Sequence, residues 1–357
     1  MNQATLRDQA QAMRTLPKAE VHVHLEGCFE ADTLAAWARQ SGTPLPRPPE
    51  RLFQFDGLAD FLQFLDWACG LAATPDRLAE LSYQYCGRLA ANGGGYADMI
   101  VNPTHWHAWH GRLGAMLDAI DAGFTAAEQD GLPPVGLCIS LLRTQTAQQA
   151  AELVDALIDL RHPRVVALSI DGNEAAAGRT GPRFAEAFRR AGAAGLRRTV
   201  HAGESSGPDG VRDAITLLGA DRIDHGVRAI DDPSLVALLA ERQIALGVCP
   251  TSNLVLGVYP SIEAHPVELL RQVVLRQPVE QAGVAATAAS AYTRLLSLPA
   301  FETVAISIPP YLRWPMMRYP RLGRRRNAAL QQKRLVQPAI LQTITFLTNA
   351  ARRRALG

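Results

Sequence analysis

The chain has 357 residues, of which 48% are hydrophobic and 20% charged, and its formal net charge is +2. These proportions are ordinary for a globular protein and exclude a disordered chain. The sequence has no apolar run of about 18 or more residues, and its first residues are polar, so we expect neither a membrane span nor a secretory signal. The five cysteines form no CxxC pair, which argues against a disulfide framework or a cysteine zinc site and favours a cytoplasmic location.

The small net charge conceals a break near Arg271. Residues 271–357 hold 14 Lys and Arg against two acidic residues, and residues 1–270 hold 22 basic against 32 acidic residues, so the two regions carry +12 and −10. We therefore divide the chain into a folded region, 1–270, and a basic, aspartate-free region, 271–357. The basic region mixes apolar pieces with arginine clusters in no helical period and contains no recognisable nucleic-acid motif, so we expect no nucleic-acid partner.

Up to residue 270, short β-rich runs alternate with amphipathic helical patterns, as in βα units. In the stretch 211–219, apolar residues at positions 211, 214, 215 and 218 follow helical spacing. Another helix is predicted from Pro233, after two aspartates. Seven strands are predicted: Glu20–His24, Tyr96–Asn102, Val135–Leu142, Val165–Asp171, Arg198–Ala202, Arg222–His225 and Ile244–Cys249.

Alternating strands and helices fit either a closed barrel or an open doubly wound sheet, and the polar residues favour the barrel. They stand at the carboxyl ends of several predicted strands, which meet at one mouth in a closed barrel. No GxGxxG or GxxxxGK[ST] motif follows the first strand, which argues against nucleotide-binding sheets. We predict an α/β fold, a (βα)8 TIM barrel, whose eighth strand is in doubt. Residues 301–308 (FETVAISI) are expected to fit poorly as that strand.

His22 and His24 lie two residues apart on the first predicted strand, so their side chains point to one face, as paired metal ligands require. His105 and His107 repeat the spacing, so spacing alone does not identify the metal-binding pair. Taken singly, the polar residues at 201–204 and 224–225 are equally compatible with strand ends, helix caps or a local hydrogen-bonded pair.

Four motifs together are more specific than any histidine pair. PKAEVHVHLEG at 17–27 resembles the first-strand motif of the adenosine deaminase family, and HAGE at 201–204 resembles its fifth-strand motif. RIDHGVR at 222–228 and CPTSN at 249–253 are similar to the next two motifs, in the same order. The resemblance covers about residues 15–270 and implies a zinc-dependent aminohydrolase whose partners are a small aminopurine and water.

Residue by residue, the resemblance implies that His22, His24 and His201 hold one Zn2+ per chain. Such a zinc site lowers the pKa of a water molecule and so activates it. Glu204 would protonate the purine ring nitrogen beside the carbon under attack, for which burial must raise the pKa of its carboxyl. His225 would orient the attacking water and stabilise developing charge.

Two further positions are implied to contact the substrate. The segment SIDGNE at 169–174 resembles the one that presents a backbone amide to the purine, and Gly172 would supply that amide, since glycine allows close approach. Glu26 and the run THWHAW at 104–109 stand where substrate contacts are expected. The indoles of that run suit either stacking on a base or packing against neighbouring loops.

The family also has an aspartate pair on its eighth strand, in a motif close to NTDDP, and its first member completes the metal site. Asp232 is the last aspartate of this chain, and no such motif follows His265. Glu280 and Glu302 are poor substitutes because neither follows a convincing strand. We hypothesise that residues from about Val273 onward are not the native continuation, most simply because of a reading-frame shift; a diverged, inactive relative with a genuine basic tail is the alternative.

The sequence thus predicts hydrolytic deamination of an aminopurine nucleoside, adenosine to inosine plus ammonia, at an activity reduced by the absent aspartate. Glutamate rather than aspartate in HLEG keeps free adenine or an aminodeoxyfutalosine-type nucleoside open as the substrate. A catalytically inactive metal- or purine-binding relative and a nucleic-acid binder acting through its arginines are the rivals from other classes. The oligomeric state is not predicted.

Overall fold

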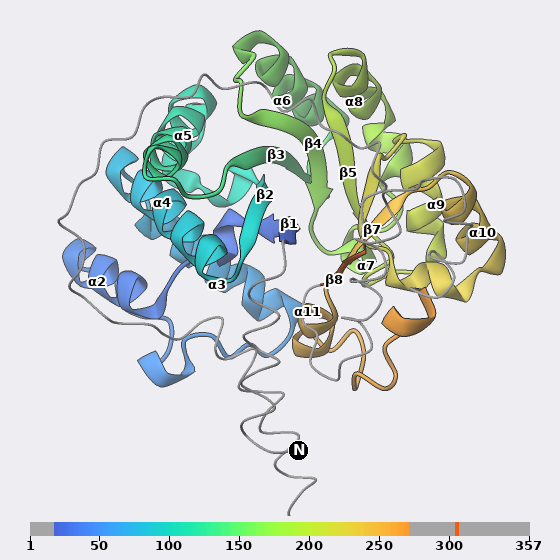
Figure 1. Ribbon diagram of the computed structural model, residues 1–357, viewed down its shortest axis with the longest axis horizontal. Coiled ribbons are helices and arrows are strands. Elements are labelled where there is room, and N and C mark those ends of the chain that lie inside the picture. Colours follow the sequence, from blue (N-terminus) through green and yellow to red (C-terminus); the bar gives the residue numbers. More distant parts are fainter. Residues whose placement is uncertain (1–17, 271–303, 307–357) are drawn as a thin grey trace, which may run out of the picture. The chain divides into compact units, whose positions relative to one another are not determined.

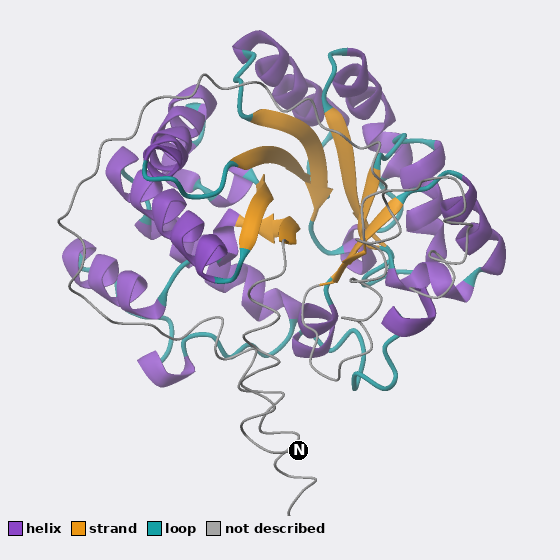
Figure 2. Ribbon diagram, viewed as in Figure 1, coloured by secondary structure: helices purple, strands orange, loops and turns teal. Residues whose placement is uncertain are grey.

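The computed structural model describes residues 18–270 and 304–306. Seven strands run parallel, and each pairs with the next along the chain. Helices lie outside the strands (Figure 1) and alternate with them (Figure 2), which is the architecture of the (βα) TIM barrel. The parallel strands are β1 (Lys18–His24), β2 (Gly94–Val101), β3 (Val135–Leu142), β4 (Val165–Asp171), β5 (Arg197–Ala202), β6 (Arg222–His225) and β7 (Ala245–Val248).

The helices fill the connections between these strands. The α-helices are α2 (Ala31–Ser41), α3 (Leu58–Leu71), α4 (Pro75–Ala91), α5 (Leu113–Gln129), α6 (Ala147–Leu160), α7 (Glu174–Ala177), α8 (Gly181–Ala193), α9 (Pro208–Thr216), α10 (Pro233–Glu241) and α11 (Pro250–Val255). Short 3₁₀ helices are η1 (Leu25–Gly27), η2 (Pro49–Arg51), η3 (Pro103–His105), η4 (His107–Trp109) and η5 (Val227–Asp231). In the described residues, no helix is both long and apolar enough to span a membrane.

The seven predicted strands are confirmed, with ends that differ by at most two residues. The agreement follows from burial on both faces: seven of the eight residues of β3 are buried, as expected of a parallel strand covered by helices. The helices show the complementary pattern. In α8 the buried side chains include Phe184, Ala187, Phe188 and Ala191, which form one apolar stripe at helical spacing. Asp232 caps α10 by accepting hydrogen bonds from the backbone N–H groups of Ser234 and Leu235, so this helix starts where predicted.

Between β7 and β1, the strand β8 (Val304–Ile306) does not continue the barrel pattern. It pairs antiparallel with β7 and also contacts β1, whereas barrel strands are parallel. For these three residues, the expectation that 301–308 fit poorly as an eighth barrel strand is confirmed; the rest of that segment lies outside the described residues. The predicted boundary at residue 270 remains a prediction, because 271–303 and 307–357 also lie outside them.

The barrel interior contains a buried ion network that spans non-adjacent strands. Nη1 of Arg222 on β6 donates to Oδ2 of Asp98 on β2 at 2.6 Å, and Nε donates to Oδ1 of Asp224 at 2.9 Å. Both carboxylates are almost fully buried, and the Thr199 hydroxyl donates to Asp224. Removing one partner of such a network leaves a buried charge uncompensated, at a cost of about 3–5 kcal/mol. The network therefore holds opposite walls of the barrel beneath the strand ends.

Candidate active site

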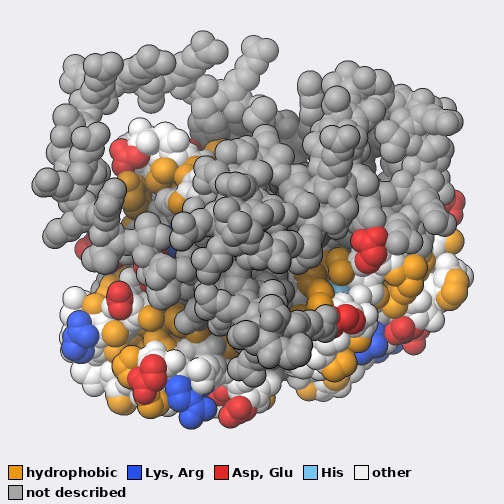
Figure 3. Space-filling model, turned by 60° about the horizontal axis from the view of Figure 1, so that its bottom comes forward, with side chains coloured by type: hydrophobic (Ala, Val, Ile, Leu, Met, Phe, Trp, Pro, Cys, Tyr) orange, Lys and Arg blue, Asp and Glu red, His pale blue; other side chains and the backbone are white. Residues whose placement is uncertain are grey.

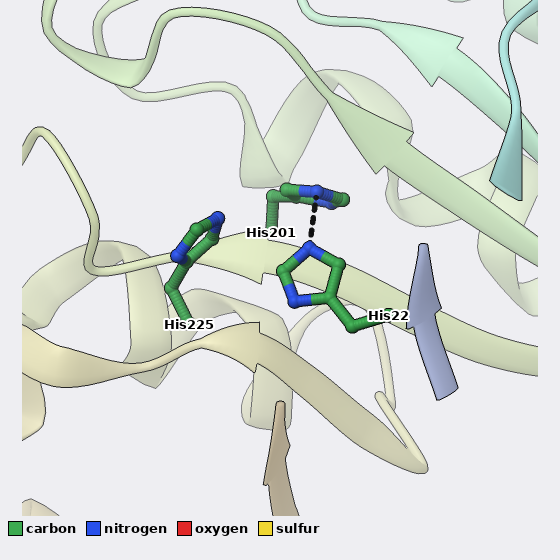
Figure 4. Close-up of side chains that lie close together, drawn as sticks. All are labelled: His22, His201 and His225. Atoms are coloured by element: carbon green, nitrogen blue, oxygen red, sulfur yellow. Dashed lines mark hydrogen bonds between the residues drawn. The ribbon is translucent and has the colours of Figure 1, made fainter. Parts of the chain in front are cut away.

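Four histidines from three strands meet at the carboxyl ends of the barrel strands. His22 and His24 lie on β1, His201 on β5 and His225 at the end of β6. Nε2 of His201 is 3.0 Å from Nε2 of His22 and 2.9 Å from Nε2 of His24. The ring centroids of His22 and His225 are 4.7 Å apart. In Figure 4, His22, His201 and His225 surround one small space, so residues distant in sequence form one site.

The ring protons of two of these histidines point away from that space. Nδ1 of His22 donates to the carbonyl oxygen of Gly247 at 2.8 Å, and Nδ1 of His201 donates to that of Ile170 at 3.0 Å. Because a carbonyl oxygen only accepts, the neutral ring of His201 carries its lone pair on Nε2, and that atom faces Nε2 of His22 and Nε2 of His24. Neutral imidazole nitrogens are ligands of zinc, so this donor set fits a divalent cation.

Burial keeps His24 and His201 in the neutral form that binds metals, whereas at His22 the neighbouring Cys249 and Asp224 outweigh burial and raise the pKa to about 10. Burial, together with the positive charge of the neighbouring His22 ring, lowers the pKa of His24 to about 3. The same two causes hold the pKa of His201 well below its ordinary value. Both rings are therefore unprotonated over the physiological pH range.

His225 adopts a backbone conformation that is uncommon for its residue type. Its φ of 68° lies in the left-handed region, which costs a residue with a side chain about 1–3 kcal/mol and is often found at functional sites. Its Nδ1 accepts a hydrogen bond from Nδ2 of Asn253 at 3.2 Å, and its Nε2 lies 3.4 Å from Oε1 of Glu204. The turn thus directs the imidazole toward Glu204.

The carboxyl of Glu204 lies in the loop that follows β5 and is mostly buried, with 13% of the side chain exposed. Burial raises its pKa, which is the shift that a proton-donating carboxyl requires. The loop itself is held by the buried carboxylate of Glu174. Oε1 of Glu174 accepts from the backbone N–H of Gly203 at 3.0 Å, and Oε2 accepts from those of Glu204 and Ser205 at 2.9 and 3.2 Å.

A buried arginine holds the other side of the same segment. Arg143 follows β3, and its Nη2 donates to the carbonyl oxygen of His201 while Nη1 donates to the hydroxyl of Thr180 at 2.6 Å. Nη2 also lies 3.7 Å from Glu174 Oε1. Residues 201–205 are thus held at both kinds of backbone group. The carboxylate of Glu174 accepts from their N–H groups, and the guanidinium of Arg143 donates to a C=O group.

Glu26 is the middle residue of η1, the short helix that directly follows His24, and it is 1% exposed. Its Oε1 accepts from the backbone N–H of Asn102 at 2.7 Å and from the indole N–H of Trp106 at 2.8 Å. Its Oε2 has no hydrogen-bond partner among the described residues and lies 3.9 Å from Nδ1 of His24. Burial raises the pKa of Glu26 to about 7. Trp106 and Trp109 are buried, so the indoles of this run pack between loops.

Gly172 stands at the end of β4 with a φ of 100°, a conformation that favours glycine. A Cβ at this position would lie 2.9 Å from Cδ1 of Leu142 and 3.6 Å from the backbone nitrogen of Arg143. The loop geometry accounts for the glycine. Its predicted contact with a purine remains a proposal.

The second histidine pair does not join the site. His105 pairs with Asp66 through an Nδ1–Oδ1 distance of 2.6 Å, and His107 is exposed and stacks on His110. Within the described residues, the cluster suited to a metal contains histidines and no carboxylate. Glu280 and Glu302 lie outside those residues. In the space-filling view, histidine surface is visible between hydrophobic and acidic side chains (Figure 3).

Four residues of this site were not assigned a role from the sequence. Arg143 directly follows one predicted strand and Glu174 stands shortly after another, so their positions were a usable signal. Asn253 ends the CPTSN motif but had no assigned partner. His265 belongs to a segment without a predicted element, and its contact with Asn253 at 3.0 Å appears only in the folded chain.

The barrel, its histidine cluster and the buried glutamate define an aminohydrolase of the TIM-barrel class. More narrowly, the chain belongs to the adenosine deaminase family, since residues 17–281 match that family's model. The family resemblance and the fold predicted from the sequence are confirmed.

Relatives of known name are similar over most of their length. The adenine deaminase of Rhodospirillum rubrum is 33% identical over 266 residues, covering 72% of this chain and 78% of the relative. That of Cupriavidus necator is also 33% identical, covering 72% and 74%. The solved adenine deaminase of Arthrobacter aurescens is 28% identical with a TM-score of 0.67, covering 72% and 79%. An amidohydrolase from Burkholderia ambifaria, solved with bound Zn, is 32% identical with a TM-score of 0.69, covering 77% of each chain.

Proposed function

We propose that this protein catalyses the zinc-dependent hydrolytic deamination of an aminopurine, with free adenine as the preferred substrate. The convergence of Nε2 of His22 and Nε2 of His24 on Nε2 of His201, at 3.0 and 2.9 Å beside a buried glutamate, is the observation that supports the chemistry. The adenine deaminases among the relatives support the substrate. Adenosine, which the motifs predicted, is the second candidate because the matching family model is that of adenosine deaminase.

His22, His24 and His201 are the proposed ligands of one Zn2+ per chain. When bound, zinc makes a water molecule acidic enough to attack at neutral pH. Glu204 holds a proton on its buried carboxyl and donates it to the ring nitrogen beside the attacked carbon. His225 orients the attacking water from the side of Glu204. Glu26 and the backbone amide of Gly172 are the proposed substrate contacts.

This activity is expected to be low in the chain as it stands. Asp232 is the last aspartate, so no eighth-strand aspartate is present to complete the ligand set. Catalytic groups that act as one unit lose several orders of magnitude in rate when one member is removed. We therefore propose that the site binds zinc and a purine and turns over slowly.

The deciding experiment combines metal analysis with an ultraviolet assay. The full chain is incubated with adenine, adenosine and an aminodeoxyfutalosine-type nucleoside, with and without added zinc. About one zinc per chain and zinc-dependent conversion of adenine before the nucleosides support the proposal. If a nucleoside is converted faster than adenine, that nucleoside is the preferred substrate instead. A protein that binds no zinc, converts none of the three and retains nucleic acid in a salt-sensitive manner contradicts the proposal.

A further inference from the structure

A chain of hydrogen bonds runs from a backbone amide to His225 through two buried side chains. Asn253 lies in α11 after β7, and its amide lies between His265 and His225. Asn253, His225 and His265 are 0%, 4% and 6% exposed. Water therefore does not compete for these contacts, and each proton position follows from the groups themselves.

The donor–acceptor direction of these hydrogen bonds is set at the end farthest from His225. The backbone N–H of Val267 donates to Nδ1 of His265 at 3.1 Å, so Nδ1 is unprotonated. Burial lowers the pKa of His265 to about 4, so the ring is neutral at pH 7 and carries its single proton on Nε2. That Nε2–H donates to Oδ1 of Asn253 at 3.0 Å.

The amide of Asn253 passes this direction on to His225. With Oδ1 accepting from His265, the NH2 group faces Nδ1 of His225 at 3.2 Å and donates to it. The neutral imidazole of His225 therefore carries its proton on Nε2, the nitrogen that lies 3.4 Å from Oε1 of Glu204.

The opposite assignment leaves donors facing donors. A proton on Nδ1 of His225 would point at the NH2 group of Asn253. Turning that amide over would place its NH2 group against the Nε2–H of His265, whose direction the amide of Val267 sets. A buried polar group left without its hydrogen bond is strongly unfavourable, so one tautomer is preferred.

We propose that Asn253 and His265 are positioning residues that hold His225 as the Nε2–H tautomer. His225 then presents a hydrogen-bond donor to the reaction site, and its only lone pair is occupied by Asn253. It orients the water and donates to developing charge, and it does not take the proton of the attacking water. The catalytic consequence depends on the proposed function, whereas the tautomer does not.

The test measures ring protonation directly. Protein labelled with ¹⁵N-histidine is studied by long-range ¹⁵N–¹H correlation, metal-free and with zinc, and the signals of His225 are assigned by their loss in His225→Gln. We expect a protonated-type shift for Nε2 and an unprotonated-type shift for Nδ1. Protonated Nδ1 in the wild-type protein overturns the proposal, and this result requires no positioning variant to fold.

Matched variants test the donor–acceptor direction of the hydrogen bonds that reach His225. His265→Gln keeps a donor toward Asn253 and should preserve the tautomer, whereas His265→Glu replaces that donor with an acceptor and should move the proton of His225 to Nδ1. Asn253→Asp, which accepts on both oxygens, should do the same. An unchanged His225 spectrum in folded His265→Glu and Asn253→Asp contradicts the proposal. Absence of zinc or deamination would count against the proposed function alone, because no tautomer measurement uses substrate.

Discussion

The region up to residue 270 and the region beyond it differ in both charge and catalytic residue types. The first carries −10 and contains all nine histidines and every aspartate, whereas the second carries +12 and contains neither type. The imidazole cluster, Glu204 and the residues that hold them all belong to the first region. The family match ends ten residues past this break, at residue 281.

The contrast between the two regions separates the arrangement of the histidines from the presence of a full set of catalytic groups. In the part of the chain that the structure describes, strands β1, β5 and β6 bring the histidines together, and no carboxylate joins their cluster. Fast turnover needs every member of a catalytic unit, because losing one member alone costs most of the rate. Our hypothesis that residues from about Val273 are not the native continuation rests on this contrast.

The largest effect is expected from restoring the missing segment. The gene is resequenced across the codon for Val273, all frames are translated, and a chain that continues with an NTDDP-like segment is produced. We expect its kcat/KM for adenine to exceed that of the present chain by about 10³-fold or more, because the catalytic unit is complete. Steady-state ultraviolet assays measure the ratio. If no frame encodes such a segment, or if the restored chain is no faster, the frame-shift hypothesis is wrong and a diverged relative is the better interpretation.

The second effect concerns which histidines hold the metal. Nε2 of His24 is 2.9 Å from that of His201, whereas His225 is bonded to Asn253 and faces Glu204. His24→Ala should weaken zinc binding by more than the roughly 10- to 100-fold that loss of an outer partner costs. His225→Ala, the matched control, should stay within that range. Competition with a chelator measures both affinities, and the reverse order would assign the metal to His22, His201 and His225.

The strand ends and the histidine cluster were predictable because they depend on local pattern and one rule of topology. Buried apolar runs such as β3 define strands, and a barrel brings their carboxyl ends together. The contacts that orient those residues were not predictable. Nothing in the sequence pairs Glu174 with the amides of residues 203–205, or decides that His24 rather than His105 faces His201, since both distinctions depend on how loops from separate strands pack.

A third, smaller effect is expected at Glu174. Glu174→Gln removes the charge that binds three backbone N–H groups, and a hydrogen bond to a charged group contributes about 1.5–3 kcal/mol. Amides 203–205 should then exchange about 10-fold faster or more, if the loss is confined to this loop. Hydrogen-exchange mass spectrometry measures the change. Glu152→Gln, on the exposed face of α6, is the matched control and should leave these amides unchanged; equal rates in both variants would mean that Glu174 does not hold the loop.

The last effect is a pH dependence of stability in the metal-free protein. Burial raises the pKa of Glu26 from 4.5 in the unfolded chain to about 7 in the fold. Between these values the folded state binds more protons than the unfolded state, so the stabilisation present below pH 4.5 is lost as the pH rises through 7. The free energy of unfolding lost in this way is at most about 3 kcal/mol, since one pKa unit corresponds to 1.36 kcal/mol. Urea unfolding with chelator at pH 5 and pH 8 should show wild type losing more stability than Glu26→Gln, which has no carboxyl to ionise. Parallel losses in the two proteins would mean that Glu26 does not titrate in this range, and the pH dependence would then belong to other groups of the site.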